Sequence, residues 1–165
     1  AQLAARLAVK QGVGDDLEGA LLAMSHIDRA VERADKRVQH THAAADKIEA
    51  AQARYERADL LTLVGQDRCD SSLMAAVIKD FEALQARFDP AYEPVTWSRV
   101  NLRLGLAMVW KGEIEGNPGV ISEGISLLST EEEPVNFEHS PLDWVAHKQA
   151  LARGLQALAE LTLNE

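Results

Sequence analysis

Apolar side chains recur every three or four residues along most of the chain, the spacing that gives an α-helix one buried face. The pattern predicts an all-α fold of seven helical segments, the first of which, residues 1–11, is only a stub. The other apolar stripes run through residues 17–38, 48–65, 73–84, 97–111, 120–128 and 144–163.

The connection between the first two long stripes is open to two interpretations. Neither glycine nor proline occurs between Gly19 and Gly65, so one continuous helix and a helical hairpin both fit. Thr41 and Asp46 can each cap a new helix, and a lone rod would leave its apolar stripe uncovered. These observations favour a hairpin that turns near residues 39–42.

Turn-forming residues mark the later boundaries. Pro94 suits the first turn of a helix, where its missing N–H leaves no hydrogen bond unmade, and we expect this helix to end at Gly112. Asn117 then stands as an N-cap directly before a proline. Ser140 and Asp143 have the spacing of a capping box, and a proline again opens the helix. Residues 130–136 are predicted to form a loop.

Two tryptophans 47 residues apart share their surroundings. Trp97 and Trp144 each follow a proline by three positions and precede a leucine by seven, and a small residue, Gly105 or Ala152, comes next. Similarity at a fixed period is typical of stacked supersecondary units. The 47-residue period predicts a single domain over residues 1–165. This domain would consist of N-terminal helices over 1–45 and repeat units over 46–93, 94–140 and 141–165, the last of them incomplete.

The stretches PVTWSRVNLRLGLA from Pro94 and PLDWVAHKQALA from Pro141 resemble the tetratricopeptide repeat (TPR), in particular its long bacterial variant with Pro-Leu-Asp-Trp-Ala and Asn-Leu-Gly. The resemblance is weaker over 46–89, where Ala50 stands in place of the tryptophan. It implies helix-turn-helix repeats stacked as an α-α superhelix, a TPR-like solenoid. The tryptophans would then be core aromatics between successive units.

Composition and charge narrow the choice of partner. The chain has 26 acidic and 17 basic residues, a formal net charge of −9, and is 47% hydrophobic. This balance argues against nucleic acid, which calls for clustered basic side chains. No apolar run approaches the roughly 20 residues of a membrane span. We expect a cytoplasmic protein, although the N-terminal Ala1 also fits a fragment or an exported chain whose signal has been removed.

Residue types of catalytic and metal sites occur without the spacing that such sites need. The single Cys69 forms neither an intramolecular disulfide nor a multi-thiolate metal site. His40 and His42 would point about 200° apart on a helix and so cannot share a metal ion. We expect His139 and His147 to lie on the surface. The sequence therefore predicts no catalytic residue, metal or cofactor, and a protein that is not an enzyme.

The resemblance implies a protein-interaction scaffold, in which the first helix of each repeat lines a concave groove that takes a peptide or a partner helix. Leu102, Leu106 and Trp110 should then be at least partly accessible. Arg99 and Arg153, which are expected beside this apolar strip, would favour a ligand with an acidic flank. The alternative is that the N-terminal helices cover this strip. The predicted groove residues are Tyr55, Asp59, Arg99, Leu102, Leu106, Trp110, Gln149 and Arg153.

Self-assembly is the second interpretation. The stripe from Leu17 to Val38 has near-heptad spacing and charged flanks, which suit a homodimeric helical interface as well as an intrachain one. A regulatory part of a larger multidomain protein would show the same features.

Overall fold

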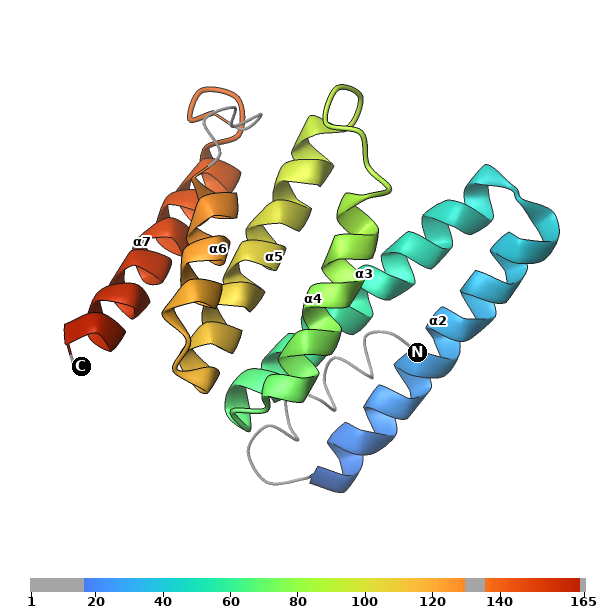
Figure 1. Ribbon diagram of the computed structural model, residues 1–165. Coiled ribbons are helices and arrows are strands. Elements are labelled where there is room, and N and C mark those ends of the chain that lie inside the picture. Colours follow the sequence, from blue (N-terminus) through green and yellow to red (C-terminus); the bar gives the residue numbers. More distant parts are fainter. Residues whose placement is uncertain (1–16, 130–135, 164–165) are drawn as a thin grey trace. The chain divides into compact units, whose positions relative to one another are not determined.

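The computed structural model describes residues 17–129 and 136–163, and within them the chain forms six α-helices and no strand. The predicted all-α fold is therefore confirmed. The stub over 1–11 and nearly all of the loop over 130–136 lie outside the described residues. The helices are α2 (Leu17–Thr41), α3 (Ala44–Asp67), α4 (Ser71–Gln85), α5 (Pro94–Glu115), α6 (Pro118–Leu128) and α7 (Pro141–Leu163) (Figure 1).

The chain divides into two compact units, residues 1–76 and residues 77–165. The first unit contains α2, α3 and the first residues of α4. The second contains the rest of α4 together with α5, α6 and α7. The single domain and the superhelix of TPR-like repeats stay predictions.

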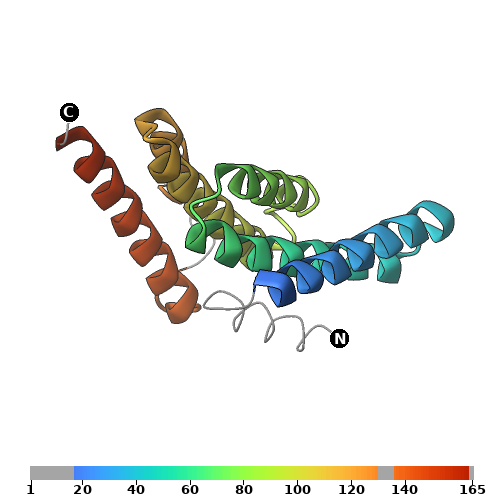
Figure 2. The same cartoon turned by 90° about the horizontal axis from the view of Figure 1, so that it is seen from below.

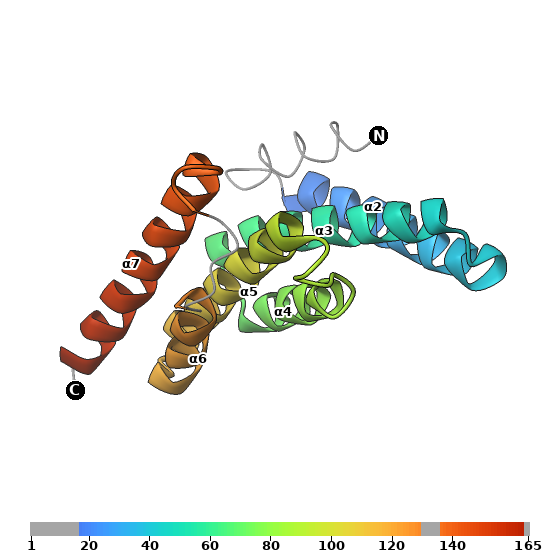
Figure 3. The ribbon, with the colours of Figure 1, turned by 90° about the horizontal axis from the view of Figure 1, so that it is seen from above.

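In the first unit, α2 and α3 lie side by side as an antiparallel hairpin, which resolves the sequence ambiguity (Figure 3). The chain reverses at His42, whose φ is 52°, and Ala43 is the N-cap of α3 without a side-chain hydrogen bond. The expectation that Thr41 or Asp46 caps this helix is therefore wrong. The Thr41 hydroxyl instead donates to the Asp46 carboxylate, so the two side chains satisfy each other across the turn.

Apolar contacts and ion pairs join the two helices of the hairpin. The middle of the α2 stripe packs inside the unit, because Ile27, Val31 and Ala34 are each at most 8% exposed. The core of this pair consists of Ala23, Ile27, Leu60 and Val64, with Met24 and Leu73 packed against it. The ion pairs between α2 and α3 are Asp28–Arg57, Asp35–Arg54 and Arg37–Glu49.

In the second unit, α5 and α6 approach closely because two glycines face each other. A methyl group at Gly105 would lie 2.7 Å from Cγ of Leu128, and one at Gly124 would lie 2.7 Å from the carbonyl oxygen of Gly105. The expectation that α5 ends at Gly112 is wrong. The helix continues to Glu115 and ends at Gly116, whose φ of 62° suits a glycine.

The last helix, α7, packs against both α5 and α6, and the three helices lie side by side in Figure 1. Their shared core consists of Leu102, Val109, Ile121, Leu128, Ala150 and Ala157. Trp97 and Trp144 are half-buried rather than enclosed in this core, since each lies in the first turn of its helix. The Trp144 ring meets Phe137 edge to face, with the ring centroids 5.4 Å apart.

Candidate functional site

The predicted groove residues lie on three helices. Tyr55 and Asp59 belong to α3 in the first unit, and the other six belong to α5 and α7 in the second. Leu102 is only 9% exposed and is part of the core shared with α6 and α7, so its expected accessibility is not observed. Leu106 and Trp110 are half-buried and so retain some accessible surface.

Both arginines of the predicted groove form ion pairs between α5 and α7. Arg99 donates from Nε and Nη2 to the two carboxylate oxygens of Asp143, at 2.8 Å each. Arg153 donates to Glu113 at 2.5 Å. The hydrogen bond from Arg99 holds the pKa of the Asp143 carboxyl below its usual value. Each positive charge that was expected to attract an acidic ligand is thus neutralised within the molecule.

The same helices share a buried polar contact that the sequence did not reveal. Ser98 is 2% exposed and its Oγ lies 2.8 Å from Nε2 of His147, which is 6% exposed. The expectation that His147 lies on the surface is therefore wrong, whereas His139 is exposed. The serine and the histidine are 49 residues apart, so only the packing of α7 on α5 brings them together. This contact links the two helices.

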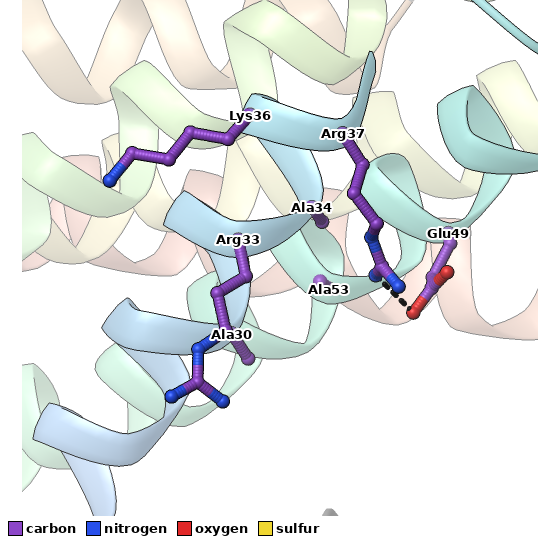
Figure 4. A pocket seen from close by; sticks show the side chains of 7 residues that line it. All are labelled: Ala30, Arg33, Ala34, Lys36, Arg37, Glu49 and Ala53. Atoms are coloured by element: carbon purple, nitrogen blue, oxygen red, sulfur yellow. Dashed lines mark hydrogen bonds and ion pairs between the residues drawn. The ribbon is translucent and has the colours of Figure 1, made fainter. Parts of the chain in front are cut away.

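A separate hollow of about 540 Å³ opens between α2 and α3 (Figure 4). We name it the α2–α3 hollow. Its size falls within the range of about 300–1,000 Å³ that is typical of ligand sites. Three alanines line it without filling it, because a methyl side chain leaves space that a longer one would occupy. The lining residues are Ala30, Arg33, Ala34, Lys36, Arg37, Glu49 and Ala53.

The charges that line the α2–α3 hollow are predominantly positive. Three cations come from α2, and one carboxylate, Glu49, comes from α3. Figure 4 shows Arg37 directed toward Glu49, and its Nη2 lies 2.6 Å from the carboxylate oxygen. Arg33 and Lys36 extend in other directions, and neither has an ion-pair partner among the described residues. Two cations therefore remain available to a ligand.

In the sequence, these cations stand out only as charged flanks of the apolar stripe over residues 17–38. Two sequence signals could have indicated the hollow. Arg33, Lys36 and Arg37 lie within five residues of a predicted helix, and two of the apolar positions near them, Ala30 and Ala34, are alanines. What the sequence did not supply is the pairing of residues 30–37 with 49–53, which depends on the turn of the hairpin.

Metal binding and membrane spanning are two further possibilities for the described part of the chain. No cluster of three or more His, Cys, Asp or Glu side chains there has a geometry that could bind a metal ion. Among the helices of the described residues, none combines the length and apolar character needed to span a bilayer.

Comparisons with known proteins give no relative for this chain. No protein-family model matches the sequence, and neither the curated proteins nor the solved structures give a significant match.

Proposed function

We propose that the chain is a protein-interaction module that captures an acidic segment of a partner protein in the α2–α3 hollow. The observation that carries the proposal is the pair of available cations, Arg33 and Lys36, at the rim of a hollow with an alanine floor. The proposal retains the scaffold function expected from the sequence and places the ligand on a different pair of helices.

Charge complementarity favours an acidic occupant. The molecule has a formal net charge of −9, yet the lining of the hollow has three cations and one carboxylate. Arginine binds carboxylates through paired, charge-assisted hydrogen bonds, and lysine adds a point charge. An acidic ligand would be repelled by most of this protein and attracted here, so the local charge would determine where it binds.

The floor of the hollow favours short apolar side chains in the ligand. Ala34 and Ala53 are 2% and 7% exposed, so their methyl groups belong to the hairpin interface and are held in place by it. A bound peptide would place a small apolar side chain against Ala30, the exposed alanine of the lining, while its carboxylates meet Arg33 and Lys36. Apolar contact at the centre with charges at the rim is the arrangement found in most protein interfaces.

The predicted groove on α5 and α7 is the second candidate surface. Half-buried Leu106 and Trp110 would contact apolar side chains of a peptide. Since Arg99 and Arg153 bind Asp143 and Glu113, this surface offers no preference for acidic ligands. The charge of the ligand therefore distinguishes the two surfaces.

The experiment measures binding of a fluorescein-labelled peptide of glutamate and alanine by fluorescence anisotropy, with a lysine and alanine peptide as the comparison. We expect the acidic peptide alone to bind, and to bind more weakly as salt is added, because salt screens exposed charges. The variant Arg33→Glu/Lys36→Glu should reduce the affinity at least about tenfold, equivalent to about 1.4 kcal/mol.

A matched control variant shows whether the loss of affinity comes from the lost cations at the hollow or from the change in net charge. Arg68→Glu/Lys79→Glu changes the net charge by the same amount at two exposed positions outside the hollow, and it should bind the acidic peptide like the original protein. Equal losses in the two variants would contradict the hollow as the site. Binding of the lysine peptide in preference to the acidic one would contradict the proposed ligand class.

A further inference from the structure

The last helix, α7, is apolar on two opposite sides. Its inner side packs on α5 and α6 through Ala150, Ala157 and neighbouring residues. Figure 2 shows α5 and α6 on one side of α7 only. The other side has a second stripe, spaced alternately by three and four residues, in which all seven members are exposed. This outer stripe consists of Leu142, Val145, Gln149, Ala152, Gln156, Ala159 and Leu163.

The outer stripe is strongly apolar for an exposed surface. Leu142 and Leu163 at its ends are each 84% exposed, and Leu155 beside it is 51% exposed. No member of the stripe is charged, although 26% of the chain is. Spacing of three and four residues over three heptads is the pattern by which one helix packs along another.

The residue types of the outer stripe read nearly the same in both directions. Ala152 stands at the centre, Gln149 and Gln156 flank it, Val145 and Ala159 follow, and leucines stand at both ends. An interface between two copies related by a two-fold axis requires such self-complementarity, because each residue meets its mirror position on the other copy.

We propose that two copies of the chain associate through the outer stripe, with their α7 helices antiparallel and the two-fold axis beside Ala152. The small alanine side chain permits a close approach of the helices at the axis. Gln149 would meet Gln156 of the second copy and donate to its amide oxygen, since Nε2 of Gln156 donates to Glu160 of its own chain at 2.7 Å. The leucines at position 142 of one copy and 163 of the other would cover each other at both ends.

The charges at the edges of the stripe favour the antiparallel arrangement. An in-register parallel pair would set Lys148 of one copy beside Arg153 of the other, which is a pairing of like charges. The antiparallel pair sets Lys148 near Gln156 instead. Arg153, which lies at the edge near the axis, is neutralised by Glu113 of its own chain.

The first test is the molar mass in solution, measured by sedimentation equilibrium over a series of concentrations. We expect a dimer that Ala152→Glu converts to a monomer, because this change places two carboxylates at the axis. Ala83→Glu adds the same charge at an exposed position on α4 and should leave the dimer intact. A monomer at every concentration, or equal effects of the two variants, would overturn the proposal.

The second test determines the orientation by disulfide crosslinking in a Cys69→Ser background, which removes the exposed native thiol. An equal mixture of the Leu142→Cys and Leu163→Cys proteins should crosslink on oxidation, whereas each protein alone should not. Crosslinking of either protein alone would overturn the antiparallel arrangement. The variant Arg33→Glu/Lys36→Glu should remain a dimer, so failure of the hollow and failure of the α7 interface are distinguishable.

Discussion

At the scale of single residues, the fold depends on small side chains at helix crossings. The repeat pattern marked Gly105 as a small residue at a recurring position, and the structure places it against Gly124 and Leu128. No comparable signal marks Gly124 in the sequence, because that glycine acquires its role only when α6 folds back on α5. Glycine is needed at both positions to bring the two backbones together rather than to allow an unusual φ.

Gly105→Ala should destabilise the second unit by about 1–3 kcal/mol, because the added methyl group would overlap Leu128 and displace α6. The cost is expected despite the higher helix propensity of alanine. Chemical unfolding measures the change in free energy of unfolding. Ser126→Ala, on the exposed side of α6, serves as the control and should stay within about 0.5 kcal/mol of the original protein. A Gly105→Ala protein as stable as this control would contradict the close crossing.

Asp70 connects the stability of the first unit to pH. Hydrogen bonds from the Ser72 hydroxyl and from the backbone N–H groups of Leu73 and Ser72 lower the pKa of its carboxyl below the usual 3.8. A carboxyl whose pKa is lower in the folded state stabilises the fold above its unfolded pKa, and this contribution is lost as the pH falls through the folded pKa.

The thermal midpoint should therefore fall as the pH drops below about 3.8, and it should fall less in Asp70→Asn, whose amide oxygen still caps α4 without titrating. NMR titration of the Asp70 carboxyl carbon gives its pKa directly. Ser72→Ala should raise that pKa toward the usual value because it removes the largest cause of the shift. An unchanged pKa in Ser72→Ala would contradict the assignment.

At the scale of helices, periodicity predicted the elements well and their contacts poorly. The apolar stripes, the prolines at positions 94, 118 and 141 and the cap at Asn117 correspond to helices in the structure. The contacts from Arg99 to Asp143 and from Arg153 to Glu113 span 44 and 40 residues. Local patterns contain no information about such pairs, so the charges of the predicted groove were interpreted as available when they are neutralised.

The variant Arg99→Ala/Arg153→Ala should weaken the attachment of α7 to α5 modestly. Each ion pair is partly exposed, and such pairs contribute about 0–1 kcal/mol. We expect the helical content measured by circular dichroism to be unchanged and the unfolding midpoint to be slightly lower. Binding of the acidic peptide should be retained. Loss of that binding would instead indicate the predicted groove on α5 and α7 as the site.

At the scale of the whole molecule, a protein with a formal net charge of −9 has a hollow whose charged lining residues are predominantly positive. Net charge alone argued only against nucleic acid, because it averages over all surfaces and does not show how charges are distributed. Arg33, Lys36 and Arg37 all belong to α2, and folding of the hairpin sets this cationic stretch beside Glu49 and Ala53 of α3. Three cations against one carboxylate would favour an acidic ligand there. The α7 stripe is a second exposed surface with a different chemistry.

The most direct test of the central claim is an NMR titration of the methyl-labelled protein with the glutamate and alanine peptide. The claim predicts that the methyl signals of Ala30, Ala34 and Ala53 shift and saturate together. It also predicts that the methyl signals of Leu106 stay in place. Shifts at Leu106 without shifts at the three alanines would place the ligand in the predicted groove and contradict the account. A spectrum that the acidic peptide leaves unchanged would contradict it equally.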